Sequence, residues 1–350
     1  MTLPNALPKL LSDYGAENLR SAMIRHWANT HQIGIDKFKL GATSLKFLDS
    51  GSQKDIDDIT HRLKKTFPKP SLKDVEKSFE LSIHPTQKKS FGAVYTPNYV
   101  IDYLTRFSLQ NALKTKKNTL RICDPSCGSG GFLIRVAELL ETDYGISADK
   151  AFSEIIVGLD IDKVALEQAK CLIELYLASK GKAMLPGKTA QLFELDTLTT
   201  DQNVILSTTS SPGGFDVIVT NPPYVKFQNL EPEYRQILIN KYDGLANGNF
   251  SLSVLFLVKG YELLSQNGYL GVITQNNLFT SLAGKNIREH LQKQQCLRRI
   301  LDFGHHQVFD NASAYTCLIF LSKEHSPMFE HSSVSDNAEQ YYKTLDNIIF

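Results

Sequence analysis

The side chains best suited to chemistry stand together directly after a short apolar run. Residues 215–220 are rich in valine and isoleucine and predict a buried β-strand, which ends at Asn221-Pro222-Pro223-Tyr224. Two successive prolines remove two backbone donors, fix two φ angles and disfavour a helix. We therefore expect a rigid, extended hook that presents an amide, carbonyl groups and a phenol ring. Such a hook suits the binding of a flat molecule that carries an amino group.

Three acidic residues end predicted strands at equal intervals upstream of the hook. Asp124, Asp160 and Asp196 are separated by 36 positions each (160 − 124 and 196 − 160). In a sheet built of repeated β-α units, the carboxyl ends of parallel strands meet at one edge, where ligands bind. An acid at the second strand tip is the usual partner of a ribose diol, and Asp196 can accept from the amino group of an adenine. A helix cap or a solvent contact explains any single acid, whereas three at successive tips predict a shared site.

A glycine-rich turn at 125–131 follows the first of these strands and precedes a helical pattern. A strand, a glycine-rich turn and a helix are typical of nucleotide sites, because glycines let the backbone approach a ligand closely. The spacing fits neither G-x-G-x-x-G nor a phosphate loop with Gly-Lys-Ser/Thr. Upstream, Thr96 is expected to cap a helix beginning near Asn98, whose first amides would bind a carboxylate; a plain capped helix is the alternative.

The composition is that of a globular protein with a sizeable core. Of the 350 residues, 42% are hydrophobic and 21% charged, and the formal net charge is +1. We predict a helical N-terminal region over residues 1–88, because Leu19, Met23 and Trp27 recur at every fourth position. Residues 89–325 contain the predicted β-α units. Residues 326–350 turn polar and are expected to form a tail or linker.

The five cysteines are scattered, with no C-x-x-C pair. This favours a reducing, cytoplasmic location and argues against zinc or a disulfide framework, so no metal site is predicted. No apolar run is long enough to span a membrane, and residues 1–11 lack the layout of a signal peptide. Because the net charge is near zero, a polyanion would have to meet a local patch. One candidate is the basic set between 285 and 299, which more simply decorates an exposed helix face.

Taken together, these motifs resemble those of S-adenosylmethionine-dependent DNA adenine-N6 methyltransferases. The resemblance rests on residues 124–132, 158–162 and 221–224. It continues into 268–274 and 308–321. Tyr95-Thr96-Pro97 precedes them, an order similar to that of the modification subunits and fused methylase–nuclease enzymes of bacterial restriction–modification systems. The resemblance implies an α/β fold: a doubly wound, mostly parallel, Rossmann-like methyltransferase sheet preceded by a helical region.

The resemblance also implies a role for each motif residue. It implies that S-adenosylmethionine contacts Tyr95, Thr96, Asp124, Ser126, Cys127, Gly128, Gly130, Asp160, Ile161, Asp196, Thr197 and Asn221. It implies that the target adenine is addressed by Asn221, Pro222, Pro223 and Tyr224, with Tyr224 and Phe309 stacking on its two faces. The implied partners are double-stranded DNA with a flipped adenine and either a separate specificity subunit or a missing target-recognition region.

The residue types fit this chemistry without the family name. The lone pair of the adenine N6 is delocalised into the ring, so the nitrogen is a poor nucleophile. The side-chain oxygen of Asn221 and the carbonyl of Pro222 can both accept its N–H groups and orient it toward a methyl donor. Two alternatives stay open: a methyltransferase acting on a protein glutamine or an RNA guanine, which shares the hook, and a catalytically silent DNA-binding or assembly subunit.

Overall fold

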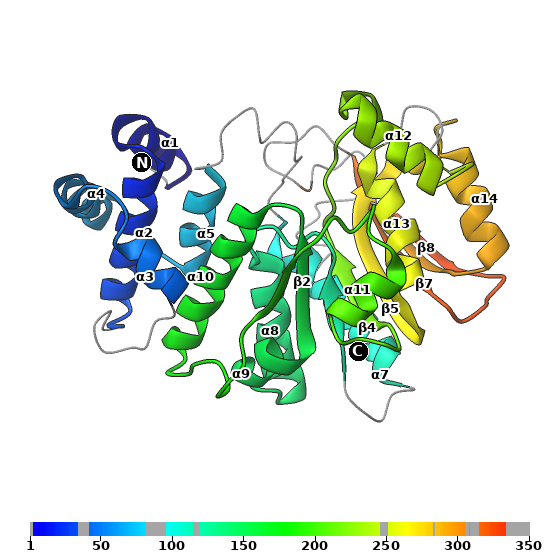
Figure 1. Ribbon diagram of the computed structural model, residues 1–350, viewed down its shortest axis with the longest axis horizontal. Helices are drawn as coiled ribbons and strands as arrows, with labels where there is room; N and C mark the ends of the chain where they lie inside the picture. The colour runs from blue at the N-terminus through cyan, green and yellow to red at the C-terminus, as the bar shows by residue number, and fades with distance from the viewer. Residues whose placement is uncertain are drawn as a thin grey trace.

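An eight-stranded sheet, in the order β3-β2-β1-β4-β5-β7-β6-β8, organises the chain (Figure 1). The structure is a computed structural model and describes residues 3–33, 42–81, 96–114, 120–245, 251–282, 284–304, 308 and 315–333. The strands are β1 (Ile122–Asp124), β2 (Ile156–Asp160), β3 (Gln191–Glu194), β4 (Phe215–Thr220), β5 (Leu264–Gln275), β6 (Leu297–Asp302), β7 (Thr316–Ser322) and β8 (Glu330–Ser333). Strands β1 to β5 run parallel, whereas β7 is antiparallel to both β5 and β6.

Helices cover both faces of this sheet. Those after the N-terminal region are α7 (Asn98–Leu113), α8 (Gly131–Tyr144), α9 (Ala148–Lys150), α10 (Lys163–Ser179), α11 (Gln202–Thr208), α12 (Pro232–Lys241), α13 (Leu252–Leu263) and α14 (Lys285–Gln294). In β4, Val217 and Val219 belong to one apolar cluster with α7, α8 and α10. Ile218 points to the other cluster, with α11, α13 and α14. Both faces of a parallel strand are buried here, which explains the continuous apolar runs in the sequence.

The chain reverses direction across the sheet between β1 and β4. From β1 it proceeds through β2 to β3 on one side, and from β4 to β5 on the other. The carboxyl ends of β1 and β4 are therefore neighbours at the topological switch point, where open α/β sheets bind their ligands. This arrangement places Asp124 and Asn221 side by side, and the predicted doubly wound α/β fold is confirmed.

The N-terminal region is helical, as predicted. It consists of α1 (Leu3–Tyr14), α2 (Ala16–Thr30), α3 (Ala42–Leu48), α4 (Gln53–Thr66) and α5 (Leu72–Leu81). Leu19, Met23 and Trp27 are buried on α2, and Val75 and Phe79 are buried on α5. Figure 1 shows these helices gathered at one end of the molecule, beside α10. This placement brings α5 to the edge of the sheet that carries the predicted site.

Two stretches differ from the sequence-based expectation. Glu330–Ser333 was assigned to a polar tail, but it forms β8 and pairs with β6, so the sheet extends to residue 333. Arg298 and Arg299 were grouped with an exposed helix face, but they lie on β6, beyond the end of α14. Arg299 is only 8% exposed, and its guanidinium lies 5.3 Å from the centre of the Phe107 ring. The assignment of these two arginines to an exposed helix face is therefore wrong.

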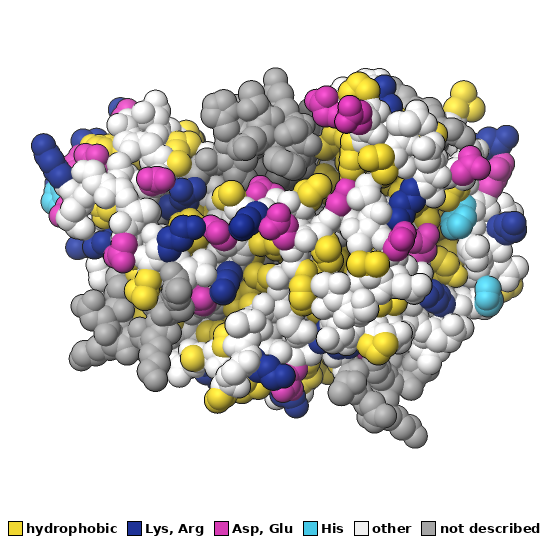
Figure 2. Space-filling model, in the orientation of Figure 1, with side chains coloured by type: hydrophobic (Ala, Val, Ile, Leu, Met, Phe, Trp, Pro, Cys, Tyr) yellow, Lys and Arg dark blue, Asp and Glu magenta, His cyan; other side chains and the backbone are white. Residues whose placement is uncertain are grey.

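The five cysteines are all unpaired and buried. Within the ranges that the structure describes, no helix has the length and apolar character needed to cross a membrane. Lys and Arg side chains are interspersed with Asp and Glu over the face seen in Figure 2. On that face, charge of one sign does not dominate among the coloured residues.

Candidate functional site

A cavity of about 710 Å³ lies at the carboxyl ends of the central parallel strands. The predicted site residues that line it are Thr96, Asp124, Ser126, Cys127, Gly128, Asp160, Ile161, Asp196, Thr197, Asn221 and Pro223. Gly130, Pro222 and Tyr224 are not among its lining residues. Tyr95 and Phe309 lie outside the described residues, so their predicted roles stay predictions. The sheet therefore brings together side chains that are up to 125 positions apart in the sequence.

Asp124 joins the glycine-rich turn to the hook. Its Oδ1 accepts the backbone N–H of Ser126 at 3.0 Å and the hydroxyl of Thr220 at 2.7 Å. Thr220 is the last residue of β4 and directly precedes Asn221. Burial raises the pKa of the Asp124 carboxyl to about 7, although both hydrogen bonds act in the opposite direction. The two halves of the site thus share one buried carboxyl group.

The glycine-rich turn is shaped by backbone contacts. Gly128 and Gly130 have φ angles of +52° and +87°, a left-handed conformation that favours glycine. A Cβ on Gly130 would approach the Cβ of Ala169 on α10 to 2.8 Å, so this position also requires close packing. Asp160 accepts the N–H of Gly128 at 2.8 Å, which ties the tip of β2 to the turn. Burial raises the pKa of the Asp160 carboxyl, and the backbone N–H groups that it accepts counteract this.

Asp196 lies two residues beyond β3 and shapes the loop that follows. It accepts the N–H groups of Leu198 at 3.0 Å and Thr199 at 3.2 Å. Tyr234 on α12 also lines the cavity; burial, and then the charge of Asp196 and a hydrogen bond to it, raises the pKa of the Tyr234 phenol. The neighbouring Thr197 donates to the Pro125 carbonyl at 2.7 Å. The loop after β3 is therefore fastened to the glycine-rich turn and covered by α12.

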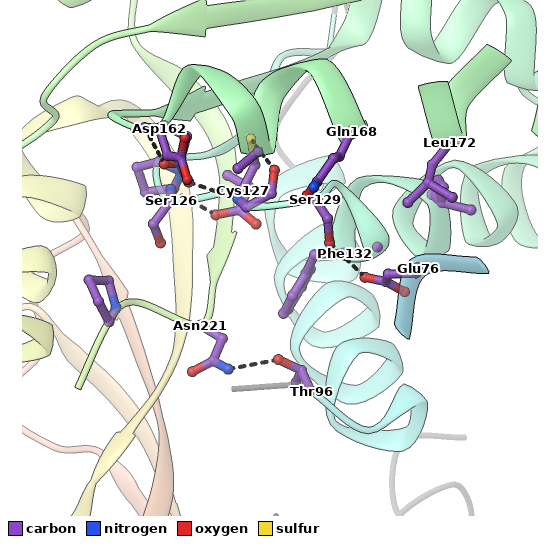
Figure 3. A pocket seen from close by; sticks show the side chains of 18 of the residues that line it. Glu76, Thr96, Ser126, Cys127, Ser129, Phe132, Asp162, Gln168, Leu172 and Asn221 are labelled. Atoms are coloured by element: carbon purple, nitrogen blue, oxygen red, sulfur yellow. Dashed lines mark hydrogen bonds between the residues drawn. The ribbon is translucent and has the colours of Figure 1, made fainter. Parts of the chain in front are cut away.

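Asn221 is oriented by a hydroxyl group from another element. Its Nδ2 donates to Thr96 Oγ1 at 2.8 Å, and Thr96 directly precedes the segment that starts α7. Thr96 does not cap that helix through its side chain, because the N-cap position is Pro97 and has no side-chain cap. In Figure 3 the side-chain oxygen of Asn221 lies on the side of the amide away from Thr96. The hydrogen bond thus fixes which way the Asn221 amide faces.

Tyr224 is anchored to the sheet. Its hydroxyl donates to the Ile273 carbonyl on β5 at 3.2 Å, and its ring is packed against the apolar cluster under α7 and α8. Burial raises the pKa of this phenol well above its ordinary value, so it stays protonated. The hook is therefore fixed at both ends, by Thr96 and by Ile273. The stacking role of Tyr224 stays a prediction.

Several residues that reach the cavity were not found by the sequence-based analysis. Lys73 and Glu76 arrive from α5 in the N-terminal region, and Gln168 arrives from α10. Ser129 of the glycine-rich turn donates to Glu76 Oε1 at 3.3 Å (Figure 3). Their sequence signal is weak, because a lysine or glutamate on an amphipathic helix is usually a solvated residue. Only the packing of α5 against the sheet reveals them.

Known proteins of restriction–modification systems are similar to this chain in sequence. Residues 154–309 match the model of the Eco57I restriction-modification methylase family. Over 289 residues the chain is 28% identical to the type II restriction enzyme and methyltransferase RM.Eco57I of Escherichia coli. That match covers 69% of this chain and 29% of the relative, so this chain spans less than a third of the relative's length.

Solved structures with a similar fold include proteins of restriction–modification systems. The methyltransferase subunit of a type I restriction-modification system from Streptococcus thermophilus gives a TM-score of 0.59 at 18% identity, over 90% of this chain and 65% of that one. DrdV, in complex with DNA, gives 0.63 at 15% identity, over 98% of this chain and 43% of that one. These likenesses establish a shared methyltransferase fold.

Proposed function

We propose that this chain transfers a methyl group from S-adenosylmethionine to N6 of adenine in DNA, as the modification part of a restriction–modification system. The observation that carries this proposal is the placement of Asn221 in the cavity, beside the glycine-rich turn. The match to the Eco57I methylase family supports the same reaction class. The DNA-bound DrdV structure supports DNA as the partner, because its fold covers nearly all of this chain.

The cavity residues fit S-adenosylmethionine in size and chemistry. At about 710 Å³ the cavity is within the range of cofactor sites. Asp160 supplies acceptors suited to a ribose diol, and Asp196 supplies acceptors suited to an adenine amino group. Ile161 is 52% exposed and lines the cavity between these two acids, which provides an apolar surface for a purine ring. When bound, the cofactor supplies an electrophilic methyl group.

The hook residues then orient the target nitrogen. With Nδ2 committed to Thr96, the Asn221 oxygen and the Pro222 carbonyl accept the two N–H groups of the adenine N6. Both acceptors stabilise the positive charge that develops on this nitrogen, and they direct its lone pair toward the methyl donor. A strong base is not required, because the nitrogen loses its proton only after it has become positively charged. Pro222 and Pro223 contribute by restricting the backbone, which reduces the entropy lost on binding.

The direct test is mass spectrometry of nucleosides after bacterial DNA is incubated with the protein and S-adenosylmethionine. We expect new N6-methyladenine with the wild type and none with Asn221→Ala. Asn240→Ala is a matched control, because this asparagine lies on α12 and is not among the residues that line the cavity. If the target sequence requires a separate specificity subunit, N6-methyladenine will appear once candidate subunits are added.

Other outcomes would redirect the proposal. N4-methylcytosine in place of N6-methyladenine would retain the amino-group chemistry and overturn the base assignment. Methylation of a protein glutamine or of RNA guanine, with unmodified DNA, would overturn DNA as the substrate. Cofactor binding without transfer to any of these substrates, even with candidate specificity subunits present, would favour a silent DNA-binding subunit.

A further inference from the structure

Two oppositely charged side chains reach the cavity from α5 in the N-terminal region. Lys73 and Glu76 are separated by one helical turn, and both line the cavity. Lys73 Nζ donates to Asn98 Oδ1 at 2.8 Å, and Asn98 is the first residue of α7. Glu76 accepts from Ser129 in the glycine-rich turn at 3.3 Å. A positive and a negative group thus stand at two different points of the same wall.

The carboxylate of Glu76 lies against the start of α8. A Cβ added to Gly131, the first residue of α8, would overlap this carboxylate, so a larger residue there would require the Glu76 side chain to move. The amides at a helix N-terminus create a positive field, which on its own would attract an anion. The negative charge of Glu76 opposes this field beside Ser129. The wall beside Ser129 therefore suits a cation.

A second acceptor faces the same place. Gln168 on α10 is 1% exposed and lines the cavity, and its Oε1 has no hydrogen-bond partner among the described residues. In Figure 3 the Gln168 amide is directed toward Ser129, and Glu76 approaches Ser129 from another side. Leaving a buried acceptor unsatisfied costs about 1–3 kcal/mol, so a ligand donor at this point would relieve the cost. An ammonium group has three such donors.

The nearby arginine is already engaged. Arg135 on α8 also lines the cavity, but its guanidinium is paired with both oxygens of Asp102 at 2.6 and 2.8 Å and with Glu138 at 2.6 Å. Lys73 is a second cation on this wall, and it stands beside the N-terminus of α7. The amides of that helix start reinforce the attraction of Lys73 for an anion. The wall thus offers a cation site near Ser129 and an anion site near Asn98.

We propose that Glu76 and Gln168 bind the α-ammonium of the cofactor's amino-acid end and that Lys73 binds its α-carboxylate. This inference rests on the proposed function, because it takes S-adenosylmethionine as the ligand. It assigns the N-terminal region a direct part in cofactor recognition, in addition to the strand-tip acids of the methylase domain. In this arrangement Asp160 and Asp196 bind the nucleoside end of the cofactor, and residues of α5 and α10 bind its amino-acid end.

Calorimetry with three cofactor analogues distinguishes binding of the α-ammonium from binding of the α-carboxylate. S-adenosylhomocysteine carries both the ammonium and the carboxylate, decarboxylated S-adenosylmethionine carries only the ammonium, and 5′-methylthioadenosine carries neither. We expect Glu76→Gln to weaken the first two by about tenfold or more and to leave the third unchanged. Lys73→Met should weaken only S-adenosylhomocysteine, by about the same factor. Gln168→Leu should follow the pattern of Glu76→Gln with a smaller loss.

Matched controls come from the same chain. Lys77→Met changes a lysine on α5 that does not line the cavity, and Glu233→Gln changes an exposed glutamate on α12. Both should leave all three affinities unchanged, and thermal unfolding should show every variant folded. Equal loss for all three analogues, or no loss for S-adenosylhomocysteine, would overturn the inference. If the wild type binds none of the analogues, the proposed function fails as well; if it binds them but methylates no DNA, only the DNA assignment fails.

Discussion

The strand ends on the two sides of the cavity hold their functional groups in different ways. At the ends of β2 and β3, Asp160 and Asp196 accept backbone N–H groups two or three positions further along the chain, and Asp160 also accepts that of Gly128. At the end of β4, the Asn221 amide donates to the side chain of Thr96, which is 125 positions away. The acids of the predicted cofactor side are thus held by backbone N–H groups, whereas the amide of the predicted base side is held by a side chain from a distant segment. A substitution on the first side should disturb both the ligand and its loop, whereas a substitution on the second should disturb orientation alone.

The largest effect is expected on the cofactor side. Asp160→Ala removes the acceptor for the ribose and also the partner of the Gly128 N–H. We expect affinity for S-adenosylhomocysteine to fall by about 100-fold or more, because two charge-assisted hydrogen bonds are lost together. Isothermal calorimetry measures this directly, with Asp57→Ala on the exposed face of α4 as control. An affinity within threefold of the wild type would contradict the role given to Asp160.

Asp124 should make stability depend on pH. Its pKa of about 7 in the folded protein exceeds the ordinary 3.8, so between these pH values the folded state binds a proton that the unfolded state has released. Protonated Asp124 therefore contributes to the free energy of unfolding at low pH. This contribution is lost as the pH rises through about 7. Asp124→Asn lacks this proton, so its free energy of unfolding should rise relative to that of the wild type by about 3 kcal/mol between pH 5 and pH 8.

Urea unfolding of both proteins at the two pH values, without cofactor, measures this difference. The asparagine can still accept from Thr220 and Ser126 through its side-chain oxygen, so the fold should be retained. A constant difference in unfolding free energy at pH 5 and pH 8 would show that Asp124 does not titrate in this range.

A smaller and more selective effect is expected at Thr96. Thr96→Val keeps the shape of the side chain and removes the acceptor of the Asn221 amide. We expect the turnover rate to fall by about tenfold, because a misoriented amide forfeits about one hydrogen bond in the transition state. Steady-state kinetics and calorimetry together would show a lower kcat with unchanged affinity for S-adenosylhomocysteine. Equal losses in kcat and in affinity for S-adenosylhomocysteine would mean that Thr96 contributes to cofactor binding.

The smallest effect is expected at the far end of the hook. Tyr224→Phe removes the hydrogen bond to the Ile273 carbonyl and retains the ring. Stability should fall by about 1 kcal/mol, the usual value for one hydrogen bond, and methyl transfer should change little. Urea unfolding and the rate of methylation check the two parts. A large loss of transfer with unchanged stability would mean that the hydroxyl itself acts on the target base.

Local pattern was enough to locate the strand tips. Asp160 and Asn221 each follow a continuous apolar run, Asp124 and Asp196 follow stretches with charged residues among the apolar ones, and a doubly wound sheet brings such ends to one edge. The apolar face of α2 was also visible in Leu19, Met23 and Trp27, which are buried. These features depend on residues close in the sequence, so periodicity is sufficient to find them.

Other features depend on packing between distant segments and were not visible in the sequence. Which polar side chains of α5 face the cavity is set by how the N-terminal helices pack against α10, so Glu76 looked like a solvated residue. Thr96 was expected to cap a helix, but tertiary structure assigns its hydroxyl to Asn221. Arg299 lies on a strand because β6 adds to the sheet edge through long-range pairing with β7.

The central claim is that cofactor binding and base orientation are carried by separate groups, and Asn221→Ala tests it most directly. Single-turnover methylation of DNA and calorimetry with S-adenosylhomocysteine should be measured on the same preparation of wild type and variant. We predict a loss of transfer of about 10²–10³-fold or more, as for other preorganised polar groups, with cofactor affinity within about twofold. Equal loss of affinity and transfer, or retained N6-methyladenine formation in the variant, would contradict the account.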